Sequence, residues 1–297
     1  MRNDGPGFEP WVVVAVADER RSAELALVLA AKSIEYERVF TGRGWTLSVP
    51  AARAAEAAAE IAAYGEENRP ERPPPPIAEI GSGRAGVIAY WAVLLAVFAF
   101  NRRDLFGFDW LGAGRLEADA VRAGEWWRAV TALTLHVDLD HLASNLAFGA
   151  FFGLFVCRYL GNGLGLAAIL LAGTLGNLVN GFVQPGVHRA IGASTAVFGA
   201  LGLLSGYVWR RGLFRRLSWR ARAAPIVAGI ALLAYTGTGG ENTDIFAHLF
   251  GFVAGTLLGA GLAAWSPPTG EAAQRAYAAA AAAALAVAWG VALAWDG

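Results

Sequence analysis

The sequence has little cysteine and little charge. Cys157 is the single cysteine among 297 residues, so the chain cannot form an internal disulfide or a structural zinc site built from several thiolates. Charged residues make up 16% of the chain, hydrophobic residues make up 56%, and the mean hydropathy is +0.43. Soluble domains contain about 25% charged residues. The composition therefore favours an integral membrane protein.

Net charge and metal motifs are also lacking. The formal net charge is zero at pH 7, which excludes a generally basic nucleic-acid-binding protein. The sequence contains four histidines but no His-Glu-x-x-His, so it does not indicate a membrane zinc protease. We expect neither a metal ion nor a cofactor.

Residues 1–69 differ from the rest of the chain because they alternate short apolar and charged elements. The order of these elements, βαββα, predicts a small α+β domain with helices on one face of a sheet, and it resembles a domain found in proteins loosely called putative signal transducers. No catalytic or phosphate-binding residues are evident, so we interpret the domain as a regulatory or binding module whose partner is unknown. The expected strands are 11–17, 34–40 and 45–49, and the expected helices are 18–32 and 51–64.

A linker over residues 70–84 separates this domain from the apolar part of the chain. Four consecutive prolines at 73–76 make it stiff, and Gly81-Ser82-Gly83 makes its end flexible. Beyond the linker, apolar stretches recur at about the 20-residue length that spans a bilayer. Residues 85–297 are therefore predicted to form an all-α domain of seven transmembrane helices. The predicted spans are 85–101, 141–160, 163–183, 191–209, 223–239, 245–265 and 276–295.

Arginines predict the orientation of these spans. The loop between the fourth and fifth spans contains six arginines and no acidic residue, which is typical of a cytoplasmic loop. The N-terminal domain is then cytoplasmic as well. The loops 102–128, 184–190 and 238–244 are expected on the external side, although 102–128 contains five arginines beside its five acidic residues.

Four polar residues lie at similar depth near the external ends of the predicted spans. His141 and Asn145 share one helical face, Ser194 begins the fourth span, and His248 lies one turn into the sixth. Polar groups in a membrane are costly, so those present usually face a cavity and have a function. This common depth predicts that the four side chains form one site.

Small residues explain how Ser194 and His248 could meet. Glycines at 251, 255 and 259 give the sixth span a smooth face, and the fourth span has small residues from Ala196 to Gly206. Such faces let two membrane helices approach closely. His248 could then act as general base for a nucleophilic Ser194, with His141, Asn145 and the Ser194 N–H available to stabilise an oxyanion.

Residues 85–297 resemble the rhomboid intramembrane serine proteases. The resemblance rests on Glu125-Trp126-Trp127-Arg128, on His141 with Asn145, on Gly192 and Ser194 followed by Gly199, and on Ala247-His248 followed by Gly251 and Gly255. It implies a six-helix core with one added C-terminal helix, a Ser194–His248 dyad and an oxyanion pocket that involves His141 and Asn145.

The resemblance also implies roles for neighbouring residues. Trp127 and Arg128 would be structural, in a loop lying partly in the outer leaflet, and Phe198 would pack against His248. Members of the family mostly have glycine after the serine, whereas this chain has Thr195. A β-branched residue restricts the backbone there, and we expect it to narrow the substrate pocket.

The predicted function is an intramembrane serine endopeptidase that cleaves transmembrane proteins in or next to their membrane segments. The predicted location is the bacterial inner membrane, among lipids, with the active site on the periplasmic side. The main alternative is a catalytically inactive relative that binds transmembrane helices as an adaptor. A transporter is less favoured, because the sequence shows neither internal repeats nor charged residues at mid-membrane.

Other polar residues are interpreted structurally. Asn177 and Asn180 are expected to hold helices together, and Asp244 is expected to cap the helix that carries His248. His136 and His188 lie at loop edges, where we expect them to be solvated.

Overall fold

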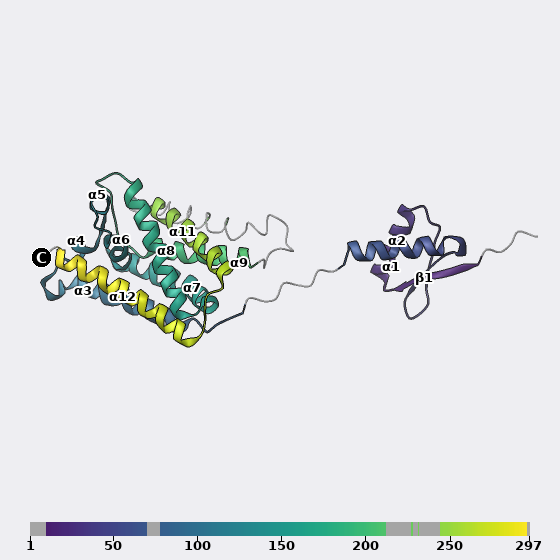
Figure 1. The fold of residues 1–297 in the computed structure, drawn as a ribbon, viewed down its shortest axis with the longest axis horizontal. Coiled ribbons are helices and arrows are strands. Elements are labelled where there is room, and N and C mark those ends of the chain that lie inside the picture. Colours follow the sequence, from purple (N-terminus) through teal and green to yellow (C-terminus); the bar gives the residue numbers. More distant parts are fainter. Residues whose placement is uncertain (1–9, 70–77, 212–226, 228–230, 232–243, 296–297) are drawn as a thin grey trace, which may run out of the picture. The chain divides into compact units, whose positions relative to one another are not determined.

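The chain forms two compact units, Met1–Pro73 and Pro74–Gly297 (Figure 1). They are seen in a computed structural model, which describes residues 10–69, 78–211, 227, 231 and 244–295. Each unit is considered by itself.

The N-terminal unit is a three-stranded antiparallel sheet with two helices. Its elements are β1 (Trp11–Ala17), α1 (Glu19–Ala31), β2 (Glu37–Phe40), β3 (Trp45–Pro50) and α2 (Ala54–Glu67), and the strand order is β1-β3-β2. Asp18 begins α1 because its carboxylate accepts the Arg21 N–H at 2.8 Å. The core is apolar and joins the helices to the central strand through Leu25, Leu29, Leu47, Val49 and Ala57. Strand β2 begins three residues after the predicted start at Ile34.

The second unit is a helical bundle. Its long helices are α3 (Arg84–Arg102), α7 (Leu139–Leu160), α8 (Asn162–Val183), α9 (Ser194–Arg210), α11 (Ile245–Trp265) and α12 (Glu271–Trp295). All of these except α9 are long and apolar enough to cross a membrane, which makes five candidate spans in the described part of the chain. Helix α9 coincides with the predicted fourth span but has 17 residues. The predicted span 223–239 lies outside the described residues, so the total of seven stays a prediction.

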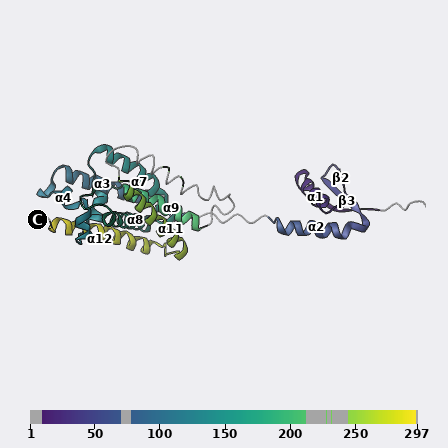
Figure 2. The ribbon, with the colours of Figure 1, turned by 90° about the horizontal axis from the view of Figure 1, so that it is seen from above.

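Helix α8 is the centre of this bundle. It contacts α7, α9, α11 and α12, and Figure 2 shows it between α7 on one side and α12 on the other. Small residues allow this crowding: a Cβ on Gly173 would lie 2.7 Å from the Ala196 Cβ, and one on Gly176 would lie 2.7 Å from the backbone N of Gly251. The central helix therefore brings α9 and α11 together.

Helices α9 and α11 are in direct backbone contact. A Cβ on Gly251, Gly255 or Gly259 would overlap a carbonyl oxygen of α9, and a Cβ on Gly202 or Gly206 would overlap one of α11. Both helices thus present glycine to the other, on α11 over a little more than two turns from Gly251 to Gly259. The glycine spacing in the sequence predicted this approach, which fixes how close side chains at the ends of the two helices can lie.

The segment between α3 and α7 folds into short elements rather than an open loop. They are η2 (Leu105–Gly107), α4 (Trp110–Gly114), β4 (Leu116–Glu117), α5 (Ala118–Arg122), α6 (Arg128–Thr131) and η3 (Ala132–Thr134). Strand β4 pairs with β5 (Arg189–Ala190), which follows α8. This pairing ties the segment to the loop that leads into α9.

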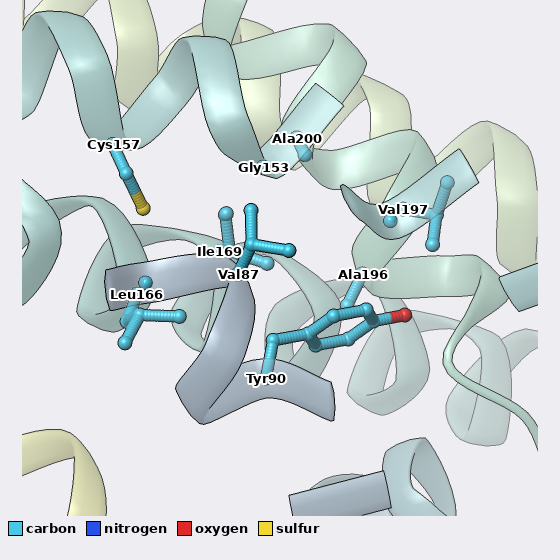
Figure 3. Close-up of a pocket in the computed structure, with 11 residues that line it drawn as sticks. Val87, Tyr90, Gly153, Cys157, Leu166, Ile169, Ala196, Val197 and Ala200 are labelled. Atoms are coloured by element: carbon cyan, nitrogen blue, oxygen red, sulfur yellow. The ribbon is translucent and has the colours of Figure 1, made fainter. Parts of the chain in front are cut away.

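A small apolar cavity of about 20 Å³ lies between α3, α7, α8 and α9 (Figure 3). A Cβ on Gly153 would meet only Ile169 Cδ1, at 3.9 Å, whereas a Cβ on Gly149 would overlap the ring of Tyr90. We expect Gly153→Ala to raise the melting temperature in detergent, because alanine stabilises a helix by about 1 kcal/mol over glycine. Gly149→Ala should lower it, because overpacking costs about 1–3 kcal/mol. Equal effects of the two substitutions would contradict this packing.

Candidate active site

Ser194 and His248 meet at the ends of α9 and α11. The His248 Nε2 and the Ser194 Oγ are 2.7 Å apart, a hydrogen-bond distance between residues 54 positions apart in sequence. Ser194 is the first residue of α9, and it follows Gly192, whose φ is +127°. A side chain at position 192 would be strained in this conformation, and its Cβ would lie 2.7 Å from the His141 Nε2. Glycine at 192 therefore lets the chain turn sharply into α9.

The His248 ring is held by packing. It is 6% exposed and stacks on Phe198, one turn after Ser194, with the ring centres 4.5 Å apart and an angle of 21° between the planes. Its backbone N–H donates to the Asp244 carbonyl at 3.2 Å. The Nδ1 is buried and has no hydrogen-bond partner among the described residues. No carboxylate in that part of the chain is therefore bonded to the ring as a third member of a triad.

His141 lies beside this pair at the start of α7, and Asn145 follows it one turn later. His141 is next to Gly192, as the contact of its Nε2 shows, and Asp138 caps the start of α7 by accepting the His141 N–H at 2.7 Å. Asn145 is 5% exposed, and its Nδ2 donates to the His141 carbonyl at 2.9 Å. An amide nitrogen carries two protons, so one Asn145 N–H is left for another acceptor.

Arg128 and Trp127 hold the segment that precedes α7. Arg128 is 7% exposed, pairs with Glu125 at 2.5 Å, and donates to the carbonyls of Gly112 and Arg115 at 2.8 and 2.9 Å. Trp127 is buried and lies 5.3 Å from Trp295 of α12, measured between ring centres. Both side chains are buried and make these contacts with the segment before α7 and with α12, which fits a structural role.

This arrangement has the parts of a hydrolytic site. A serine whose hydroxyl is bonded to an imidazole can become a nucleophile, because the imidazole accepts its proton. The first N–H groups of a helix have no partner within that helix, so the start of α9 offers donors to a negatively charged oxygen. In the described part of the chain no group of three or more acidic, cysteine or histidine residues could hold a metal ion.

The chain is similar in sequence to a known protein family and to several of its members. It matches the Rhomboid domain family over residues 123–265. It is 32% identical over 139 residues to the putative rhomboid protease YdcA of Bacillus subtilis (strain 168), an alignment that covers 46% of this chain and 68% of that protein. The chain belongs to the rhomboid family. The matched region includes His141, Ser194 and His248.

Other rhomboids match over smaller shares of their length. Rhomboid protease GluP of Bacillus subtilis (strain 168) is 32% identical over 174 residues, which cover 59% of this chain and 33% of GluP. Rhomboid-like protease 3 of Toxoplasma gondii is 34% identical over 148 residues, or 49% of this chain and 55% of that protein. This rhomboid therefore spans a third of GluP and about half of the Toxoplasma protein. Its family and its apolar helices make it a multi-pass membrane protein.

The Thr195 side chain of this rhomboid lies in the interface between helices. Its side chain is 3% exposed, and its Cγ2 lies against the α-carbons of Gly176 and Gly251, where α8 and α11 converge. The methyl group thus fills a helix interface. The expectation that Thr195 narrows the substrate pocket by restricting the backbone stays a prediction, because the packing of its side chain does not test it.

The expectation that His136 and His188 are solvated is wrong for His136 and holds only in part for His188, whose side chain is 23% exposed. His136 is fully buried, and its Nε2 accepts the Ala193 N–H at 3.4 Å. His188 is bonded to Asp244, with its Nε2 2.7 Å from the carboxylate. A position at a loop edge carries no sign of these two contacts, which join residues 57 and 56 positions apart in sequence. The prediction that Asp244 caps α11 is confirmed, since its Oδ1 accepts the Ala247 N–H at 3.0 Å.

The two asparagines of α8 join separate segments of the rhomboid, as expected. One partner is in the short helix α6, and the other is the residue that caps α11. Asn177 donates to the Ala129 carbonyl of α6 at 3.0 Å, and Asn180 donates to Asp244 at 2.5 Å. Both are at most 3% exposed. These bonds give partners to the buried amide nitrogens of both residues, while the Asn180 Oδ1 has no hydrogen-bond partner among the described residues.

The buried His136 should make stability depend on pH. Burial, followed by the nearby His141, lowers the pKa of His136 from 6.5 to about 4. Between these values the unfolded chain binds a proton that the folded protein does not, so acid favours unfolding. We expect the free energy of unfolding to fall by up to about 3 kcal/mol from this group as the pH drops from 6.5 to 4.

Denaturant unfolding in detergent at several pH values measures this dependence. The control is His136→Gln, which keeps an acceptor for the Ala193 N–H but does not titrate. Other groups lose stability in acid equally in both proteins, so the variant should show the shallower decline. Parallel declines would contradict the assignment.

Proposed function

We propose that this rhomboid is an active serine endopeptidase that cleaves peptide bonds in or next to the transmembrane segments of other membrane proteins. The observation that carries the proposal is the 2.7 Å contact between Ser194 Oγ and His248 Nε2. Its relatives GluP and YdcA are named rhomboid proteases, one of them as putative.

The proposed reaction follows from the positions of the two side chains. His248 Nε2 takes the Ser194 proton as Oγ bonds to the substrate carbonyl carbon, and the carbonyl oxygen becomes an oxyanion. The oxyanion is stabilised by the Ser194 N–H with His141 and Asn145. His248 then gives the proton to the leaving amine as the peptide C–N bond breaks. Water, activated by the same imidazole, hydrolyses the acyl-enzyme and restores Ser194.

The remaining assignments rest on the sequence. The six arginines between positions 210 and 222 support a cytoplasmic N-terminal unit, and the starts of α7, α9 and α11 would then lie on the external, periplasmic side of a bacterial inner membrane. The substrates are transmembrane proteins, because only these reach a site at this depth from within the lipid. The N-terminal unit is proposed to bind a separate partner.

An inactive adaptor is the competing function, and one experiment separates the two. The detergent-solubilised protein is incubated with a generic single-span membrane protein, and cleavage by the wild type is compared with cleavage by Ser194→Ala. Cleavage by the wild type alone supports the protease. Stable binding of the substrate without cleavage supports the adaptor.

We expect His141→Ala and Asn145→Ala each to lower kcat without preventing folding. Loss of one oxyanion donor costs about 10²–10³ in rate in a soluble hydrolase. The measurement is the turnover of a single-span substrate at saturation, together with the melting temperature. Ser144→Ala is a matched control on the same turn of α7, because in the described part of the chain the Ser144 hydroxyl donates to the His141 carbonyl alone, at 2.9 Å. A change in KM alone would contradict the oxyanion role.

A further inference from the structure

Three polar side chains from separate segments meet where α11 begins. Asn180 comes from the end of α8, His188 from the loop before β5, and Asp244 from the start of α11. The Asp244 Oδ2 is 2.7 Å from His188 Nε2 and accepts the Asn180 Nδ2–H at 2.5 Å. The Asp244 side chain is 15% exposed and that of His188 is 23% exposed. We call these three residues the α11 clasp.

The two oxygens of Asp244 have different tasks. Oδ1 accepts the Ala247 N–H and so caps the first turn of α11, while Oδ2 receives the two donors from outside the helix. A cap needs only one oxygen. The second oxygen joins the start of α11 to α8 and to the loop that leads into α9.

The loop that supplies His188 is itself held in place. The His188 carbonyl accepts the Ala118 N–H at 3.1 Å, and Arg122 donates to the Gly181 and Gln184 carbonyls at 3.0 and 2.8 Å. His188 is thus a fixed anchor for Asp244. Two rigid segments, α8 and this loop, determine where α11 starts.

The position of His248 depends on that start. Asp244 is four residues before His248, and its carbonyl accepts the His248 N–H at 3.2 Å. Because His248 Nδ1 has no hydrogen-bond partner among the described residues, no second side chain aims the ring through that atom. The ring is aimed by Phe198 and by the backbone of its own helical turn.

We propose that Asn180, His188 and Asp244 are positioning residues that set the His248 imidazole at the distance and angle needed to take the Ser194 proton. The inference rests on the proposed proteolytic function. In a triad, a third side chain orients the imidazole by a hydrogen bond to its ring. Here the α11 clasp would orient the imidazole by fixing the backbone of the helical turn that carries it. A shift of about 1 Å in a reacting group can cost about 10²-fold in rate, so the effect should appear in kcat.

The test compares variants of the full chain in detergent with a single-span substrate. His188→Ala and Asn180→Ala leave the Oδ1 cap intact, and each is expected to lower kcat by about tenfold to 10²-fold with KM unchanged. His188→Gln, which restores a donor, should recover part of the loss. His188→Ala combined with Asp244→Asn should be less harmful than the product of the single effects, because both remove the same contact. The control is Asp109→Asn, which should keep the wild-type kcat. The Asp109 carboxylate also caps a helix, since it accepts the Gly112 N–H at the start of α4 at 2.8 Å.

Each other outcome overturns the inference. Wild-type kcat in both His188→Ala and Asn180→Ala would show that the clasp does not position His248. A fall in kcat that follows a lower melting temperature, without recovery in His188→Gln, would show a purely structural role. In both cases the wild type still cleaves and the proposed function stands. A wild type that neither cleaves the substrate nor reacts with a fluorophosphonate would overturn the proposed function, and this inference with it.

Discussion

Ser194→Ala is expected to abolish cleavage of a single-span substrate while the protein remains folded. The substitution removes the only atom that can bond to the substrate carbon, and knocking out the serine of a soluble hydrolase costs about 2 × 10⁶ in kcat. We expect the variant to keep the wild-type fold, because the substitution removes one oxygen atom, which contacts His248, and so leaves little empty space. A fluorophosphonate should label the wild type and fail to label the variant.

The same expectation extends to His248 and has a matched control. His248→Ala should also abolish cleavage, and the double variant should be no slower than either single variant, because nucleophile and base act as one unit. Ser205→Ala is the control on the same helix as Ser194. Among the described residues its buried hydroxyl donates to the Leu201 carbonyl alone, at 2.8 Å, so cleavage should persist. A double variant much slower than the single variants would contradict a shared dyad.

Gly255→Ala is expected to lower both activity and stability by large amounts. A Cβ at this position would overlap the Gly199 carbonyl oxygen, and neither backbone can yield without moving its helix. Separation of α9 from α11 would stretch the Ser194–His248 contact, for which about 1 Å can cost about 10²-fold in rate. Overpacking of this kind costs about 1–3 kcal/mol of stability.

Gly261→Ala is the matched control on the same helix. A Cβ on Gly261 meets nothing within 4 Å, so this substitution should keep kcat and leave the melting temperature unchanged or higher. Turnover and thermal unfolding of the two variants in detergent measure the difference. Equal behaviour of Gly255→Ala and Gly261→Ala would show that backbone contact between α9 and α11 is not what brings the two residues together.

Local patterns carried much of the fold. The valine-rich run at 11–17 coincides with β1, and the long apolar stretches coincide with α7, α8 and α11 within two residues. Such elements depend on the helix and strand propensities of their residues and on the spacing of apolar residues, both of which can be read from neighbouring positions in the sequence. Boundaries were less exact: α12 begins at Glu271, five residues before the predicted start. Its polar first turns are held against α8, where Gln274 accepts the Gly163 and Leu164 N–H groups.

The sequence by itself determined the membrane class, the family resemblance and the residues proposed for chemistry, since glycine spacing and rare polar residues at one depth are local properties. Only the tertiary structure decided the partners of His136, His188 and Asn180 and the place of Thr195. Each of these contacts joins segments far apart along the chain. A single histidine or threonine carries no signal of its partner, because burial and hydrogen bonding are settled by which helices converge around it.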